Sequence, residues 1–77
     1  MKVFGRSKMA PDVLLTMDEV TFLAGPEQLR SLARFFLAQA EKQEEGTGRD
    51  HEHYSDSAGA IDGDHEVIVA DPKILPG

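Results

Sequence analysis

Residues 19–36 have the sequence EVTFLAGPEQLRSLARFF, which predicts a strand, a sharp turn and an amphipathic helix in succession. β-branched and aromatic side chains favour strand over residues 13–24, interrupted at Asp18 and Glu19, as one strand with a bulge or as a tight hairpin. In the second half, Val20, Phe22 and Ala24 share one face. Gly25 and Pro26 end this strand, because proline suits the first helical position, where its missing amide would have no partner. The helix should therefore begin at Pro26.

The predicted helix, over about residues 26–45, carries a broad apolar stripe and stops at Gly46, a natural residue for a helix end. The stripe contains Leu29, Leu32, Ala33, Phe36, Leu37 and Ala40. We expect Phe36 to be the core residue of this stripe. Phe35 projects about 100° away from it, so we interpret Phe35 as a residue at the edge of the core or, alternatively, as a contact at a protein interface.

The rest of the chain predicts short strands. Residues 51–55 and 65–70 favour strands, and the small and acidic residues between them suit a hairpin loop. Residues 1–12 are interpreted as a flexible tail or an edge strand. A chain of 77 residues has room for one core, so residues 1–77 should form a single domain. The predicted fold is α+β, a small two-layer β-α-β-β sandwich with the helix on a mostly antiparallel sheet and one or two extra N-terminal strands.

Charge is distributed unevenly along this chain, whose formal net charge is −6. Residues 44–71 contain nine carboxylates and a single basic residue, Arg49. Such a segment repels phosphate and attracts cationic surfaces, so we expect no nucleic-acid partner. It serves either as a solubilising face or as a docking surface for a basic protein. The residues expected at such a contact are Asp50, Glu52, Tyr54, Asp56, Asp62, Asp64 and Phe35.

His51 and His53 are the candidate metal ligands, because residues two apart on a strand point the same way and both imidazoles could reach one ion. We favour the simpler interpretation, in which they are polar strand residues that hydrogen-bond across the sheet. A calcium loop that starts at Asp56 fails on spacing, since its third and fifth positions are Ala58 and Ala60. We therefore expect no metal and no other cofactor.

Catalytic motifs do not stand out in this sequence. It has neither a nucleophile elbow nor a glycine-rich phosphate loop, so we expect no enzyme activity. The cysteine-free composition is compatible with a reducing compartment, and the cytoplasm is the default location. We find no apolar run of the length of a secretory signal or a membrane span, so we expect no membrane partner.

Several short motifs carry a resemblance to a known family. They are EVTF at 19–22, GPEQL at 25–29, LAxFFL at 32–37, DHxH at 50–53 and VIVxDP at 67–72. Over about residues 19–72 the chain resembles small bacterial immunity proteins of polymorphic toxin systems, in particular the group called immunity protein thirty-two. The resemblance implies a protein that binds a cognate toxin domain and blocks it, with no catalytic residues to transfer. Residues 1–12 fall outside the resemblance.

Three functions fit these observations. We favour a non-catalytic immunity protein that neutralises a basic toxin domain through an acidic surface. The first alternative is a structural or accessory module that forms a homodimer through the sheet face that the helix leaves uncovered. The second is a small metal-binding domain that uses His51 and His53.

Overall fold

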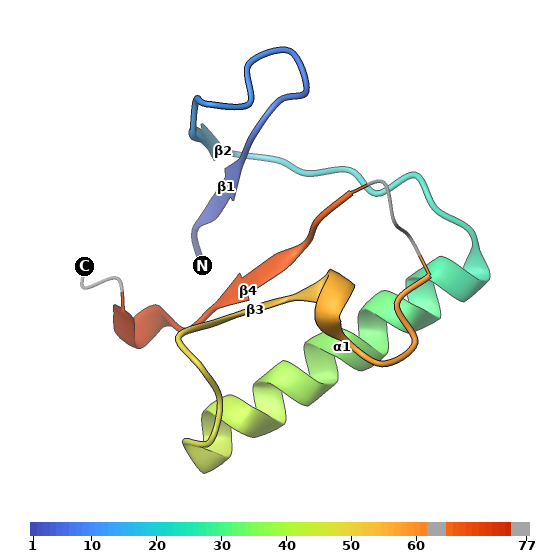
Figure 1. The fold of residues 1–77 in the computed structure, drawn as a ribbon, viewed down its shortest axis with the longest axis vertical. Coiled ribbons are helices and arrows are strands. Elements are labelled where there is room, and N and C mark those ends of the chain that lie inside the picture. Colours follow the sequence, from blue (N-terminus) through green and yellow to red (C-terminus); the bar gives the residue numbers. More distant parts are fainter. Residues whose placement is uncertain (62–64, 75–77) are drawn as a thin grey trace.

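The computed structural model describes residues 1–61 and 65–74, which contain one α-helix and two pairs of short antiparallel strands (Figure 1). In chain order the elements are β1 (Val3–Gly5), β2 (Leu15–Met17), α1 (Pro26–Glu45), β3 (His51–His53), the 3-10 helix η1 (Tyr54–Asp56), β4 (Ile68–Ala70) and the 3-10 helix η2 (Pro72–Ile74). β1 pairs with β2, and β3 pairs with β4. The predicted α+β class is confirmed, although these strands form two small sheets instead of one.

The helix α1 begins and ends where the sequence predicts. At its start Pro26 occupies the first turn, and the backbone N–H of Gly25 donates a hydrogen bond to the side-chain oxygen of Gln28 at 3.2 Å. At its end Gly46 has a φ of 70°, a left-handed conformation that glycine adopts without strain, and its N–H donates to the carbonyl of Gln43 at 3.3 Å. None of the helices in the described ranges is long and apolar enough to cross a membrane.

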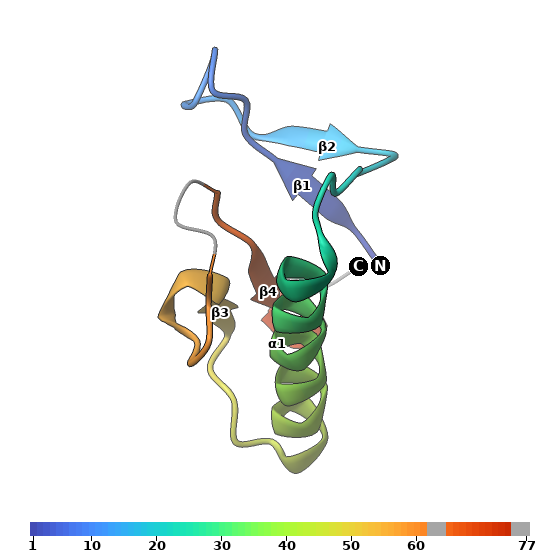
Figure 2. The same ribbon diagram turned by 90° about the vertical axis from the view of Figure 1, so that its right-hand side faces the viewer.

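The core lies between α1 and the segment formed by β3 and η1, and Figure 2 shows α1 running along one side of this segment. Phe35 of α1 and Tyr54 of η1 are only 3% and 2% exposed. Their rings meet edge to face, with centroids 5.5 Å apart. Ser31 and Gln39, one turn before and one turn after Phe35, are buried beside it. These three helical residues form the face of α1 that packs inward.

The prediction that Phe36 is the core residue and Phe35 the edge residue is wrong. Phe36 is 42% exposed and Leu37 is 65% exposed, so the centre of the apolar stripe is turned away from the core. The physical reason is the hydroxyl of Tyr54, which needs a hydrogen-bond partner once its ring is buried. Ser31 supplies that partner at 2.5 Å, and this bond turns the face that carries Ser31 and Phe35 toward η1.

The N-terminal hairpin supplies the other two strands. Phe4 of β1 lies opposite Thr16 of β2, so the segment 1–12 contributes an edge strand, one of the two expectations for it. Of the region 13–24 that favours strand, the first half contains β2 (Leu15–Met17), which pairs with β1, and residues 20–24 form no strand. Figures 1 and 2 show the hairpin at one end of the long axis and the C-terminal end of α1 at the other.

Candidate functional site

The strands β3 and β4 present one face to α1 and the other face to solvent. His51 lies opposite Ala70 and His53 lies opposite Ile68, and residues paired in this way share one face of a sheet. Ile68 is 51% exposed, which is high for a large apolar residue in a strand. We call the surface formed by His51, His53, Ile68 and Ala70, together with Glu66 at its end, the outer face.

Glu66 fixes the charge of this outer face. Its carboxylate accepts hydrogen bonds from the Ser55 hydroxyl at 2.6 Å and from the Ser55 backbone N–H at 3.1 Å, and it lies 3.3 Å from Nδ1 of His53. The Ser55 hydroxyl is the largest cause that lowers the pKa of Glu66 below its ordinary value, while partial burial opposes the shift. These hydrogen bonds therefore favour the charged form of Glu66, and they tie the start of β4 to η1.

We expect the stability of the protein to depend on pH through Glu66. Its pKa is lower in the folded than in the unfolded chain, so the charged carboxylate stabilises the fold above the unfolded-state pKa. That contribution is lost as the pH falls through the folded-state pKa. Between about pH 6 and pH 3, the melting temperature of the wild type should fall more than that of Glu66→Gln, by roughly 1–4 °C for a partly exposed group. Thermal unfolding followed by circular dichroism checks this, and equal pH dependence of the two proteins would contradict it.

The acidic residues predicted for a partner contact occupy different environments. Asp50 and Asp56 are exposed, at the two ends of the segment formed by β3 and η1. Glu52 points to the opposite side, toward α1, where its Oε1 lies 4.0 Å from both Lys42 Nζ and Arg49 Nε. Asp62 and Asp64 lie outside the described residues. Asp50 and Asp56 are therefore open to solvent near the ends of this segment, whereas Glu52 lies beside Lys42 of α1.

The two aromatic residues predicted for the contact, Phe35 and Tyr54, are core residues in this structure. The Ser31 hydroxyl donates to the carbonyl of Gly59 at 2.7 Å, so the bond between Ser31 and Tyr54 must use the proton of Tyr54. The Tyr54 oxygen in turn accepts the backbone N–H of Ile61 at 3.2 Å. This chain of bonds anchors the loop after η1 to α1, and it leaves neither ring surface open to a partner.

His51 and His53 lie on the same face of β3, as the two-residue repeat of a strand predicts. Their rings meet edge to face with centroids 5.3 Å apart. Within the ranges 1–61 and 65–74, no three histidine, cysteine or carboxylate side chains are grouped so that they could hold a metal ion. Glu66, the carboxylate beside His53, is already engaged by Ser55.

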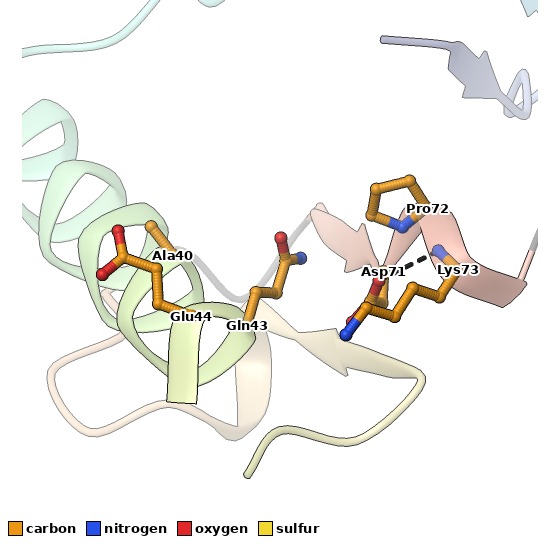
Figure 3. Close-up of a pocket in the computed structure, with 6 residues that line it drawn as sticks. All are labelled: Ala40, Gln43, Glu44, Asp71, Pro72 and Lys73. Atoms are coloured by element: carbon orange, nitrogen blue, oxygen red, sulfur yellow. Dashed lines mark hydrogen bonds between the residues drawn. The ribbon is translucent and has the colours of Figure 1, made fainter. Parts of the chain in front are cut away.

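Two hollows open elsewhere on the described surface. The first, of about 600 Å³, separates the C-terminal turns of α1 from the start of η2 (Figure 3). Its lining residues are Ala40, Gln43 and Glu44 on one side and Asp71, Pro72 and Lys73 on the other. The second, of about 500 Å³, lies between residues 21–24 and 65–67 and reaches down to Leu32 and Tyr54. The charged side chains of the first hollow are surface groups, and the second hollow is lined by both apolar and polar side chains, Glu66 among them.

Sequence reasoning missed the roles of Glu66 and Ile68. The signal that could have found them is the strand parity: in a hairpin of residues 51–55 with residues 66–70, the side chains of 66, 68 and 70 share a face with those of 51 and 53. These residues can be assigned to one face only when the register of the two strands is known. The composition of the loop between the strands does not determine that register. The outer face thus emerges from the structure as a surface with an apolar centre and an acidic margin.

Comparison with known protein families matches residues 19–72 to the family described as immunity protein 32. The matched range contains all of α1, β3 and β4, including the outer face, and leaves β1 and β2 outside. No match is found among the curated proteins or among the solved structures. Because the match covers well over half of the chain, the chain belongs to the immunity protein 32 family.

Proposed function

We propose that this protein binds a cognate toxin domain and neutralises it by occupying its surface, without catalysis of its own. Membership of the immunity protein 32 family supports a protein toxin as the partner. The single observation that carries the proposed contact is Ile68, a large apolar side chain held half-exposed between histidine rings and carboxylates on the outer face. We assign the contact to that face and to the exposed residues Asp50 and Asp56.

The chemistry of the outer face fits a basic partner. The carboxylate of Glu66 lies at the end of this face, and the exposed Asp50 and Asp56 lie at the two ends of the segment formed by β3 and η1. In protein interfaces an apolar anchor supplies much of the affinity, while charged residues at the rim mainly raise the association rate and its salt dependence. The proposal therefore assigns affinity to Ile68 and steering to the carboxylates. It locates the encounter in the cytoplasm, a reducing compartment that suits a cysteine-free chain.

Affinity capture from a lysate of the native host tests the charge part of this proposal. Compared with the wild type, the variant Asp50→Asn, Asp56→Asn, Glu66→Gln should recover at least tenfold less of a basic partner at low salt, with a smaller deficit at high salt. The matched control is Asp12→Asn, Asp18→Asn, Glu19→Gln, which removes the same charge from exposed positions near the hairpin. Equal recovery by the wild type and the first variant would show that the acidic margin is not the contact.

A further inference from the structure

The helix α1 carries a second, exposed apolar face besides the one that packs inward. Its members are Leu29, Ala33, Phe36, Leu37 and Ala40, which we call the outer helix face. Leu29 is 47% exposed, and Leu37 is the most exposed of the large residues in this set. Phe36 follows Phe35 directly, so this face lies about 100° round the helix from the buried one. It therefore points neither at the core nor at the outer face of β3 and β4.

The monomer exposes more surface than a chain of its size usually does. Its accessible surface is 6444 Å² at a mass of 8.4 kDa, whereas a compact monomer of that mass has about 4,600 Å². The radius of gyration is 13.2 Å, compared with roughly 11.5 Å for a compact domain of this length. This excess surface belongs to the molecule as a whole, and the exposed side chains of Leu29, Phe36 and Leu37 are part of it.

The charges beside the outer helix face are arranged so that they complement a second copy of themselves. Arg30 and Arg34 lie in the N-terminal half of α1, and Glu41 and Glu44 lie in its C-terminal half. When two identical helices pack antiparallel about a two-fold axis, one side of the first helix contacts the same side of the second. The N-terminal half of each helix then lies against the C-terminal half of the other. Arg30 and Glu44 lie equally far before and after Leu37 in the sequence. An antiparallel pair centred on Leu37 therefore sets Arg30 of each copy opposite Glu44 of the other.

We propose that two copies of this chain associate through the outer helix face, with the two α1 helices antiparallel and crossing at Leu37. This flank carries two arginines and two glutamates, so it complements a second copy of itself and has no excess of either charge for a basic or an acidic partner. The dimer contact and the toxin contact use different sides of the molecule. This inference does not depend on the proposed function, and each can fail without the other.

Sedimentation velocity on the full chain, from about 1 to 500 μM, tests the dimer. The wild type should sediment as a dimer at the upper concentrations, and Leu37→Glu and Leu37→Lys should each be monomeric, with at least tenfold weaker association, because like charges meet at the two-fold axis. An equimolar mixture of the two variants should form dimers again. Leu37 is largely exposed, so both variants should keep the helical circular dichroism of the wild type. A wild type that is monomeric throughout, or a Leu37→Glu variant that still forms dimers, would overturn the proposal.

Charge reversal tests the antiparallel arrangement separately. Arg30→Glu should weaken the dimer several-fold, and the double variant Arg30→Glu, Glu44→Arg should restore the wild-type association. The control is Lys8→Glu, an equivalent reversal at an exposed position near the N-terminal hairpin, which should leave the dimer unchanged. Failure of the double variant to recover, while Arg30→Glu weakens the dimer, would overturn the antiparallel pairing.

Discussion

Replacing Phe35 with alanine is expected to lower the free energy of unfolding by about 3–4 kcal/mol, while Phe36→Ala should cost less than about 1 kcal/mol. The two residues are neighbours of the same type on the same helix, and they differ in burial, since Phe35 is enclosed and Phe36 is not. Phe35→Ala removes the ring that packs on Tyr54 and leaves a cavity in a core with few large side chains. A 77-residue chain has a total stability of about 4–12 kcal/mol, so this single change should remove a quarter or more of it.

Urea unfolding followed by circular dichroism measures this difference, at a concentration low enough to keep the chain monomeric. Phe35→Leu serves as a milder variant if Phe35→Ala does not fold, and it should still be less stable than Phe36→Ala. The result that would contradict the structure is an equal or larger loss for Phe36→Ala. In that case the apolar stripe, as hydropathy predicts it, would be the packed face of α1.

The ends of α1 were predictable from local chemistry. Gly25 and Pro26 determine where the helix begins and Gly46 determines where it ends, and each acts through its own backbone conformation or its missing amide. Such signals need no knowledge of the partners that the helix meets in the fold. The predicted helix bounds, residues 26 and 45, therefore agree with the structure.

The packed face of α1 was not predictable in the same way. Hydropathy favours the side of Phe36 and Leu37, but the structure buries the side of Ser31, Phe35 and Gln39. The decisive contact is the bond from the Tyr54 hydroxyl to Ser31, between residues far apart in the sequence. A buried hydroxyl without a partner costs about 1–3 kcal/mol, so the bond to Ser31 adds to the burial of the Phe35 ring in favouring this face of α1. A sequence pattern carries no information on such a pairing.

The candidate site shows the same division between local and long-range information. The shared face of His51 and His53 follows from the two-residue repeat of any strand, and it was predicted correctly. The addition of Ile68 and Glu66 to that face depends on the register of β3 against β4, which the long acidic loop leaves undetermined. The inward direction of Glu52 also depends on a distant residue, Lys42 of α1. The acidic residue content of this segment was thus evident from the sequence. The positions of its side chains in the fold were not.

Under the proposed function, substitution of Ile68 is expected to have the largest effect on binding of a toxin domain. Ile68→Ala should weaken the complex about 30-fold, because it removes an apolar anchor from the centre of the contact. Ile68→Lys should weaken it at least 100-fold, because it also sets a positive charge against a basic partner. Titration calorimetry with the toxin domain recovered by affinity capture measures both effects. The melting temperature should change little, since Ile68 is half-exposed and lies on the side of β4 that faces solvent.

Val13→Lys provides the matched control for this prediction. Val13 is 50% exposed, close to the 51% of Ile68, but it lies in the hairpin outside residues 19–72. The Val13→Lys variant should therefore bind the toxin domain with the affinity of the wild type. If Ile68→Lys also binds with unchanged affinity, the contact lies elsewhere, and family membership would still stand because it rests on the sequence match alone. If both lysine variants lose affinity to the same extent, added charge acts at long range, and Ile68 is not an anchor.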